Sequence, residues 1–499
     1  MSNHSRRGVL KGIAGSAVVL SSMGVASAAD GRAEYVVTAP GGGARKRLER
    51  EGIEMRGETA DGDVLLVAAA SRSAVADVGG VRAVEPNERY RPVGPALRET
   101  AASVDDELAD LQWDKTEETT GAFAAHDAAT GEGSTVAIID TGIDTTHPDL
   151  RTRAGRGGLF RADGETSPSG DSFVPGDTTI DAKLPQGFTD GSAEELEPYV
   201  YRGAPTTREQ AAADDVQSHG SHCAGIATGK NDGTTGIAGM APDADVVPLR
   251  VFYWAEMTGY VHERDDGTEE ELTVTTLFTT DFDILSAIGY AADIGADAAN
   301  MSLGGGVVKG SAHKSGEHVA YQTVVQRAVQ RGTVVTASAG NAESNLQQGG
   351  YYTLPNSVPG AVSVSATGPT NELAFYSNYG TSDVDVGAPG GGYETLEKSL
   401  SDDTEYPYPT NLVLSSVPAE LNGGAEYDWY AGTSMAAPQV AGLVALVREV
   451  NPDLNAKQVQ QIIERTARFS NGSSSPEIGA GIVYAPDAVE EASRRTGGK

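Results

Sequence analysis

The feature that most constrains how this chain folds is an alternation of short apolar segments with amphipathic ones, which begins near residue 111. Buried strands are predicted at residues 135–140, 245–249, 298–301, 333–337 and 361–366. Helices are predicted at residues 282–294, 321–331 and 434–450. Strands that alternate with helices form a parallel sheet covered by helices on both faces. We therefore predict an α/β domain over residues 111–499, with polar, acidic surface insertions at about 151–216, 252–280 and 391–427.

A smaller unit precedes this domain, at residues 29–90. Its strands are predicted at residues 35–37, 63–69 and 81–85, and its helices at 45–51 and 71–78. A β-α-β-α-β unit of this size predicts a small ferredoxin-like α+β domain. Residues 91–110 are rich in proline, glycine and acidic side chains and predict a linker. We expect the smaller unit to be removed by processing there, with the mature N-terminus between residues 90 and 113.

Residues 1–28 predict an export signal. Arg6, Arg7 and Lys11 precede a weakly apolar run, and the small residues 26–28 supply a cleavage site. This order of segments is typical of a signal peptide and is too short for a membrane-spanning helix. Paired arginines indicate the twin-arginine type, which exports folded proteins, and the alternative is an ordinary secretory signal. The sequence therefore predicts a secreted, extracellular protein with no membrane span.

The charge balance is strongly acidic, with 70 Asp and Glu against 37 Lys and Arg and a formal net charge of −33. Such a surface repels phosphate backbones and anionic lipids, so binding to nucleic acids or membranes is disfavoured. The acidic residues are dispersed along the chain, which argues against a disordered acidic tail. High salt screens repulsion among dispersed carboxylates, so we predict a salt-requiring protein.

Three short motifs carry the residue types of nucleophilic catalysis. They are Asp140-Thr141-Gly142 after a predicted strand, His219-Gly220 at the start of a helix, and Gly432-Thr433-Ser434 at the start of another. Each motif alone has an ordinary explanation as a turn, a buried hydrogen bond or a helix cap. Together they supply what a serine nucleophile needs, since its hydroxyl requires a base and the base requires a carboxylate.

The predicted topology brings these motifs together. The carboxyl ends of parallel strands and the amino ends of helices meet at one edge of a sheet. We therefore predict that Asp140, His219 and Ser434 converge in one crevice. Asn341 follows the strand predicted at 333–337, and its amide would donate to a tetrahedral oxyanion together with the Ser434 N–H, a donor contribution of about 2.7–4 kcal/mol. The alternative for Asn341 is a turn residue after glycine.

The order Asp, His, Ser with these local sequences resembles the subtilisin-like serine proteases, the subtilases, over about residues 111–490. The resemblance implies a subtilisin-like fold and a serine endopeptidase that cleaves proteins and peptides. It implies that Asp140 orients the base, His219 is the general base, Ser434 is the nucleophile and Asn341 is the oxyanion donor. The substrate-binding residues that it implies are Ser302, Leu303, Gly304, Ser338, Ala339 and Gly340.

The flanking parts extend this resemblance. Residues 29–90 resemble the inhibitory, chaperone-like propeptide of the family, which implies an intramolecular inhibitor of a monomeric enzyme. The twin-arginine-type signal and the acidity resemble those of haloarchaeal halolysins. The insertions widen the spacing of Asp140, His219 and Ser434 relative to compact subtilases, so the shape of the cleft and the side-chain specificity stay open.

Calcium is the cofactor that the sequence predicts. With one cysteine, Cys223, the chain cannot form an intramolecular disulfide, so its stability outside the cell must come from elsewhere. Asp149 matches a calcium-binding position of many subtilases, and the loop that begins at Asn231 resembles the second half of that site. Ordinary turn chemistry is the alternative for both. We expect Cys223 to be a packed thiol and His222 to be structural.

Two other functions compete with this interpretation. Asp140-Thr141-Gly142 matches the active-site tripeptide of aspartic proteases, but that mechanism needs a second such motif, and none with suitable surroundings occurs. Pepstatin and fluorophosphonates would distinguish the two classes. A subtilase fold that only binds is the other alternative, and protein that leaves casein uncut in molar salt after removal of the propeptide would support it.

Overall fold

The structure is a computed structural model of the chain. It describes residues 22–26, 31–92, 95–100, 108–163, 172–231, 236–264, 267–303, 308–309, 318–347, 351–469 and 474–496. Residues 1–21 and 27–30, which hold most of the predicted export signal, lie outside the described residues. Among the described helices, none combines the length and the apolar character that spanning a membrane requires.

A sheet of eight described strands forms the centre of the larger domain, in the order β10-β9-β15-β8-β18-β20-β22-β23. The strands are β8 Thr135–Asp140, β9 Gly158–Phe160, β10 Phe173–Pro175, β15 Asp245–Arg250, β18 Ala298–Met301, β20 Val334–Ser338, β22 Ala361–Thr367 and β23 Val386–Pro389. Neighbours from β9 to β23 pair in parallel, whereas β10 pairs with β9 antiparallel. The predicted parallel α/β fold is confirmed.

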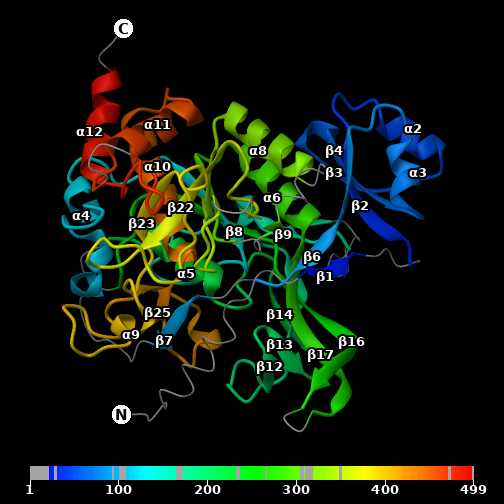
Figure 1. The fold of residues 1–499 in the computed structure, drawn as a ribbon, viewed down its shortest axis with the longest axis horizontal. Coiled ribbons are helices and arrows are strands. Elements are labelled where there is room, and N and C mark those ends of the chain that lie inside the picture. The colour runs from blue at the N-terminus through cyan, green and yellow to red at the C-terminus, as the bar shows by residue number, and fades with distance from the viewer. Residues whose placement is uncertain are drawn as a thin grey trace.

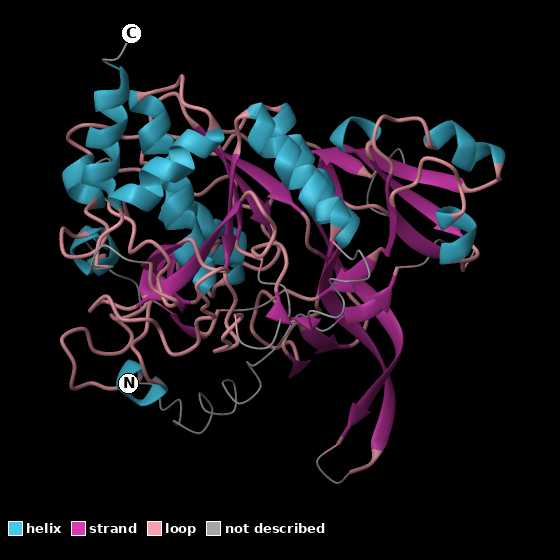
Figure 2. Ribbon diagram, turned by 45° about the horizontal axis from the view of Figure 1, so that its top comes forward, coloured by secondary structure: helices cyan, strands magenta, loops and turns pink. Residues whose placement is uncertain are grey.

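Helices cover both faces of this sheet (Figure 2). One face carries α5 His219–Thr228, α10 Thr433–Val450, α11 Ala456–Thr466 and α12 Ala485–Thr496, and the other carries α6 Asp281–Asp293 and α8 Val319–Arg331. The side chains of β8 alternate between the two cores. Val136 and Ile138 pack with α5 and α10, whereas Ala137 and Ile139 pack with α6 and α8. This period of two explains why a strand buried on both faces consists of apolar residues throughout.

The smaller N-terminal domain is an antiparallel sheet in the order β3-β4-β2-β5 with two short helices. Its elements are β2 Ala33–Thr38, α2 Arg45–Arg50, β3 Glu54–Thr59, β4 Val64–Ala69, α3 Arg72–Ala76 and β5 Ala83–Pro86. Strand β3 was not predicted, because its sequence is polar and its side chains are mostly half-buried. Val36, Val64 and Leu66 pack into the core formed by α6 and α8, so one face of this domain is covered by the larger one.

Smaller elements complete the fold. The further strands are β1 Ser22–Val25, β6 Glu88–Tyr90, β7 Leu97–Thr100, β11 Thr179–Leu184, β12 Glu195–Glu197, β13 Val200–Arg202, β14 Thr206–Ala211, β16 Tyr253–Glu263, β17 Glu269–Thr280, β19 Val308–Lys309, β21 Tyr351–Tyr352, β24 Val413–Ser416 and β25 Tyr427–Ala431. Two short helices are α4 Ala122–Ala125 and α9 Leu396–Ser399, and 3-10 turns lie at Ala60–Gly62, Leu108–Leu111, Trp113–Lys115, Ala154–Arg156 and Ala419–Leu421. Strand β7 therefore lies inside the segment predicted to be a linker.

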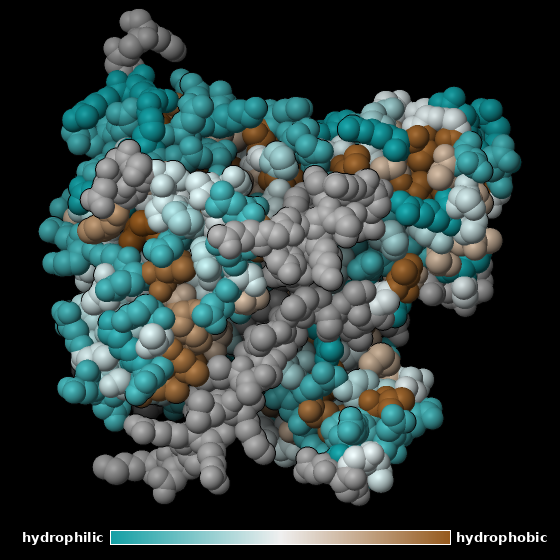
Figure 3. Space-filling model, viewed as in Figure 1, coloured by the Kyte–Doolittle hydropathy of each residue, from teal (hydrophilic) through white to brown (hydrophobic). Residues whose placement is uncertain are grey.

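The insertion predicted at 252–280 is a long hairpin of β16 and β17 that projects from the body of the molecule (Figure 1). Its tip is exposed, as predicted for a surface insertion. Its base is not: Tyr253 and Trp254 are buried, and Leu277 packs into the core beneath α6. Hydrophilic residues dominate the face of the molecule drawn in Figure 3, with small apolar patches between them.

Candidate active site

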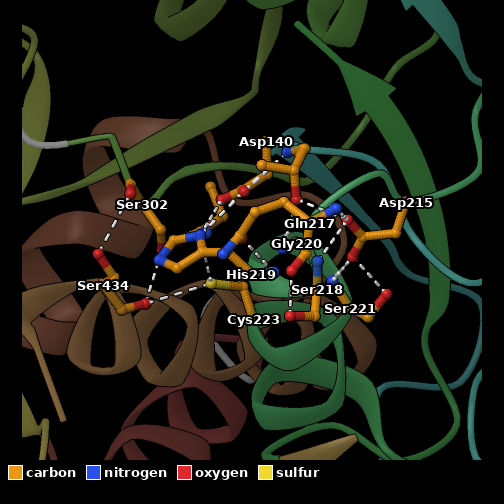
Figure 4. Close-up of polar contacts among 12 residues, drawn as sticks. Asp140, Asp215, Gln217, Ser218, His219, Gly220, Ser221, Cys223, Ser302 and Ser434 are labelled. Atoms are coloured by element: carbon orange, nitrogen blue, oxygen red, sulfur yellow. Dashed lines mark hydrogen bonds and ion pairs between the residues drawn. The ribbon is translucent and has the colours of Figure 1, made fainter. Parts of the chain in front are cut away.

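Asp140 and His219 form a buried hydrogen-bonded pair. Asp140 ends β8, His219 begins α5, and Nδ1 of His219 donates to the two carboxylate oxygens over 2.9 and 3.0 Å (Figure 4). A Cβ atom on Gly220 would lie 2.1 Å from the Gly142 carbonyl, so only glycine allows α5 to approach β8 this closely. The proton on Nδ1 leaves Nε2, at the opposite edge of the ring, as the acceptor.

Asp215 fixes the turn that leads into His219. One of its carboxylate oxygens accepts from the N–H groups of residues 217–218, at 2.9 Å each, and from the Thr141 hydroxyl at 2.8 Å. The other accepts from the Ser221 N–H at 2.9 Å and from its hydroxyl at 2.6 Å. Asp215 thereby ties the turn after β8 to the first turn of α5. Asp215 was not among the predicted site residues, because it lies four positions before the helix and its role depends on Thr141, which is distant in the sequence.

Ser434 is the second residue of α10 and is 2% exposed. Its Oγ donates to the carbonyl of Ser302 over 3.2 Å, and Nε2 of His219 has no hydrogen-bond partner among the described residues. The sulfur of Cys223 lies 3.9 Å from His219 Nδ1 and 3.4 Å from the Ser434 carbonyl oxygen. His219 and Ser434 therefore lie on either side of the same thiol. A hydrogen bond between the Ser434 hydroxyl and Nε2 would require the hydroxyl to turn away from the Ser302 carbonyl.

Asn341 follows β20 and has a fixed amide orientation. Its Oδ1 accepts from the N–H of Thr433 at 2.9 Å and from the Thr433 hydroxyl at 2.8 Å. A backbone N–H requires an oxygen acceptor, so the NH₂ group of Asn341 must lie on the other side. Among the described residues this group makes no hydrogen bond, and it lies beside Gly432, two residues before Ser434. It is available to a ligand oxygen.

The predicted substrate-binding residues lie at two strand ends next to Ser434. Ser302 and Leu303 follow β18, and the Ser302 hydroxyl donates to the Ser434 carbonyl over 2.7 Å. Ser338 ends β20, and Ala339 and Gly340 follow it. The Gly340 N–H donates to the Thr433 hydroxyl over 3.1 Å, which ties this turn to the start of α10. Gly304, the sixth residue predicted, lies outside the described residues.

Electrostatics make His219 a stronger base than an ordinary histidine. Burial alone would lower the pKa of His219, but the charge of Asp140 and the contact with Cys223 outweigh burial and raise this pKa well above its usual value. Burial raises the pKa of the Cys223 thiol, which agrees with a packed, neutral side chain. The ring of His222 stacks on that of Tyr430, with centroids 4.1 Å apart, and hydrogen-bonds a backbone carbonyl. His222 is a packing residue, as predicted.

The described residues cover only part of the calcium site predicted at Asp149 and Asn231. One carboxylate oxygen of Asp149 accepts from the Ile237 N–H at 3.0 Å and from the Tyr427 hydroxyl at 2.8 Å. These partners are hydrogen-bond donors, whereas Ca²⁺ requires six to eight oxygen ligands. Asn231 is exposed and lies 3.4 Å from a ring nitrogen of His126. Residues 232–235 of this loop lie outside the described residues, so the calcium site stays a prediction.

Among the described residues, one group of three side chains has the geometry to hold a metal ion, and it consists of Asp140, His219 and Cys223. It coincides with the hydrogen-bonded pair and its neighbouring thiol. The structure brings the predicted residues Asp140, His219, Asn341 and Ser434 to the same edge of the sheet.

Comparison with known proteins decides the family. A family model described as the subtilase family, peptidase S8, matches residues 131–481. The chain belongs to the subtilase family. This membership rules against the aspartic protease alternative, because the tripeptide at Asp140 lies within the matched subtilase region.

The chain is similar to several known proteases at sequence identities of 22–33%. The chain is 33% identical over 413 residues to the extracellular protease of Xanthomonas campestris pv. campestris. The alignment covers 82% of this chain and 60% of the length of that relative. A solved protease of Pseudoalteromonas arctica PAMC 21717 aligns at 27% identity with a TM-score of 0.53, covering 78% of this chain and all of that one. Fervidolysin from Fervidobacterium pennivorans aligns with a TM-score of 0.58 at 22% identity, over 95% of this chain and 64% of that one, which supports the fold alone.

Proposed function

We propose that this subtilase is a secreted serine endopeptidase that forms an acyl-enzyme on Ser434. The observation that carries the proposal is the buried Asp140–His219 pair, whose free ring nitrogen faces Ser434 (Figure 4). The free amide of Asn341 lies next to the start of the same helix, where its oxygen accepts from Thr433. The relative from Xanthomonas is named an extracellular protease, which supports the same activity and location.

Each side chain has a defined part in this reaction. Nε2 of His219 takes the proton from the Ser434 hydroxyl as Oγ adds to the substrate carbonyl, and Asp140 stabilises the imidazolium. The Asn341 NH₂ and the Ser434 backbone N–H donate to the resulting oxyanion. His219 then gives its proton to the leaving amine, and the acyl-enzyme forms. Water, deprotonated by the same imidazole, releases the acid and restores Ser434.

Substrate would bind as an extended chain along residues 302–304, with the side chain before the cut bond in a pocket at 338–340. The N-terminal domain would act as an intramolecular inhibitor. It already contacts the catalytic domain through Glu85, which accepts hydrogen bonds from the N–H groups at the start of α8. We further propose export through a twin-arginine signal and adaptation to high salt, as in halolysins, because of the paired arginines and the net charge of −33.

Replacing Ser434 with alanine tests the proposal. We expect Ser434→Ala to lose casein hydrolysis and to accumulate as a full-length precursor, because the enzyme is expected to remove its own N-terminal domain. A fluorophosphonate probe should label the unaltered protein and not the variant. Cys223→Ala is the control that should retain labelling. A Ser434→Ala variant that hydrolyses casein and is processed at the normal rate would disprove the assignment.

A further inference from the structure

The segment predicted as a linker contains a strand that is built into the catalytic domain. Strand β7 pairs antiparallel with β25, from Leu97 opposite Ala431 to Thr100 opposite Asp428. The Ala96 N–H donates to the Ala431 carbonyl over 2.5 Å. Leu97 is 4% exposed and belongs to the hydrophobic core formed with α5 and α10. The segment therefore packs as a part of the catalytic domain.

The residues just before this segment lie at the junction of the two domains. Strand β6, Glu88–Tyr90, pairs with β1 and with the end of β17 and follows β5 of the N-terminal sheet. Among the described residues before Ala96, none belongs to the hydrophobic core that contains Leu97. The contacts with the core around Leu97 thus begin at Ala96, six residues after the end of β6, and six residues span about 20 Å at most.

Arg98 fastens β7 to β25. Its Nε donates to the Asp428 carboxylate over 2.8 Å, a second nitrogen donates to Asn422 over 2.8 Å, and the guanidinium lies over the Tyr430 ring at 4.9 Å from its centroid. The Asp428 side chain is fully buried, whereas that of Arg98 is 37% exposed. A buried carboxylate that loses a hydrogen-bonded cation is strongly destabilising.

This contact leads directly to the active site. The Tyr430 hydroxyl is 2.9 Å from that of Ser218, the residue before His219, and His222 of α5 stacks on the Tyr430 ring. Strand β25 ends three residues before Ser434. Arg98 therefore holds β25 in place. This strand contacts the turn before His219 through Tyr430 and leads into α10, which carries Ser434.

We propose that β7 stays with the mature enzyme as a strap, that the chain is cut between Tyr90 and Leu97, and that Arg98 is a positioning residue for Ser434 and His219. The cut adds water across one peptide bond, which leaves a carboxylate on the N-terminal domain and an amine on the catalytic domain. The proposal rests on the proposed function in one respect, namely that the enzyme makes this cut itself.

The N-terminus of the mature enzyme tests where the cut lies. After processing of the full chain, intact mass and N-terminal sequencing of the large fragment should give a first residue between 91 and 97. A large fragment that begins after Thr100 would overturn the proposal. If no processing occurs at all, the proposed function has failed. The role of β7 is then tested by the thermal stability of the uncut chain alone.

That stability is measured on the Ser434→Ala precursor, which needs no activity. Adding Arg98→Gln should lower its thermal midpoint by on the order of 5 °C or more, and Arg98→Lys should restore part of the loss. The control is Arg153→Gln, because Arg153 pairs with Asp245 at the surface and is 50% exposed. Equal midpoints for Arg98→Gln and Arg153→Gln would refute the strap.

Kinetics separate positioning from stability alone. In the active enzyme, Arg98→Gln should lower kcat by roughly ten- to a hundredfold and leave KM within about twofold, because misplaced reacting groups slow the chemical step. Arg98→Lys should recover much of kcat. A variant with a lower thermal midpoint and an unchanged kcat would show that β7 stabilises the fold without positioning the site.

Discussion

Asp140 and His219 lie where bulk water is nearly excluded, with exposures of 1% and 5%. In such surroundings a charge on one side chain strongly affects the proton affinity of the other. In the proposed mechanism His219 must be neutral to accept the Ser434 proton, yet Asp140 holds the pKa of His219 well above the usual value. The fraction of neutral imidazole therefore increases as the pH rises through that elevated pKa.

We accordingly expect kcat/KM to rise with pH well beyond the range in which an ordinary histidine titrates. Asp140→Asn removes the negative charge, so the pKa of His219 should fall and the acid limb of the profile should move to lower pH. The same change removes the acceptor that fixes the tautomer, and kcat should drop by about 10⁴-fold. Profiles of both proteins on one peptide substrate measure the two effects, and an unmoved acid limb would contradict the assignment.

Asn341 allows a second test at this scale. Asn341→Ala removes one donor to the oxyanion, so kcat should fall by about 10²–10³-fold while KM changes little. Asn341 also accepts from the N–H and hydroxyl of Thr433, so thermal melting has to show that the variant stays folded. A fall in activity of less than about tenfold in a folded variant would remove Asn341 from the mechanism.

The sequence predicted these residues because each occurs at a recognisable boundary between elements. Asp140 ends an apolar strand, His219 begins a helix and is followed by Gly220, and Ser434 lies in the first turn of a helix after Gly432. Asp215 could not be predicted in the same way, because its role depends on Thr141, which lies 74 positions away. The hydrogen bond from Ser434 to the Ser302 carbonyl likewise depends on side-chain rotation, which leaves no pattern in the sequence.

At the scale of elements, amphipathic helices and apolar strands were predictable, and polar strands were not. Strand β3 reads Glu-Met-Arg-Gly-Glu-Thr, and it becomes a strand because β4 supplies a pairing edge. Strand β7 is similar, since β25 recruits it from a segment whose composition is typical of a linker. Tertiary pairing overrides weak local preference in both cases.

The contact between β6 and α6 carries a prediction of its own. Asp281 accepts from the Glu88 N–H at 3.1 Å and from the hydroxyls of Tyr90 and Tyr321 at 3.2 and 3.0 Å. Burial raises the pKa of Asp281 to about 7. A carboxyl whose pKa is raised in the folded protein adds stability at low pH, and this stability is lost as the pH rises through that pKa.

We expect the thermal midpoint of the Ser434→Ala precursor to fall between about pH 4 and pH 7 through this group. Asp281→Asn is neutral at every pH, so the same precursor with this substitution should show a shallower fall over that interval. Melting curves at matched ionic strength measure the difference. Parallel curves for the two proteins would show that Asp281 does not control this interface.

At the scale of the whole molecule, 70 acidic side chains oppose 37 basic ones. Their mutual repulsion acts over about 30 Å at 0.01 M salt and over about 3 Å at 1 M salt. The compact state should therefore weaken as salt is removed. We expect both the thermal midpoint and the casein-cleaving activity to decline on dialysis from molar to millimolar KCl.

A neutral osmolyte at low salt is the control, since it cannot screen charge. Recovery of activity by KCl but not by sucrose would agree with charge repulsion. Activity that is indifferent to KCl over this range would instead mean that the acidic surface is compatible with dilute buffer and that salt adaptation is not a property of this chain.

The pairing of β6 with Thr279 and Thr280 at the end of β17 has a consequence for the enzyme after processing. If the N-terminal domain is removed as we propose, these backbone groups lose their partner and leave an unpaired strand edge. An unpaired strand edge can pair with any extended chain, whether a substrate or another unfolded protein. The newly processed protease should therefore be most prone to aggregation, and to cleavage of other copies of itself, until a substrate pairs with this edge.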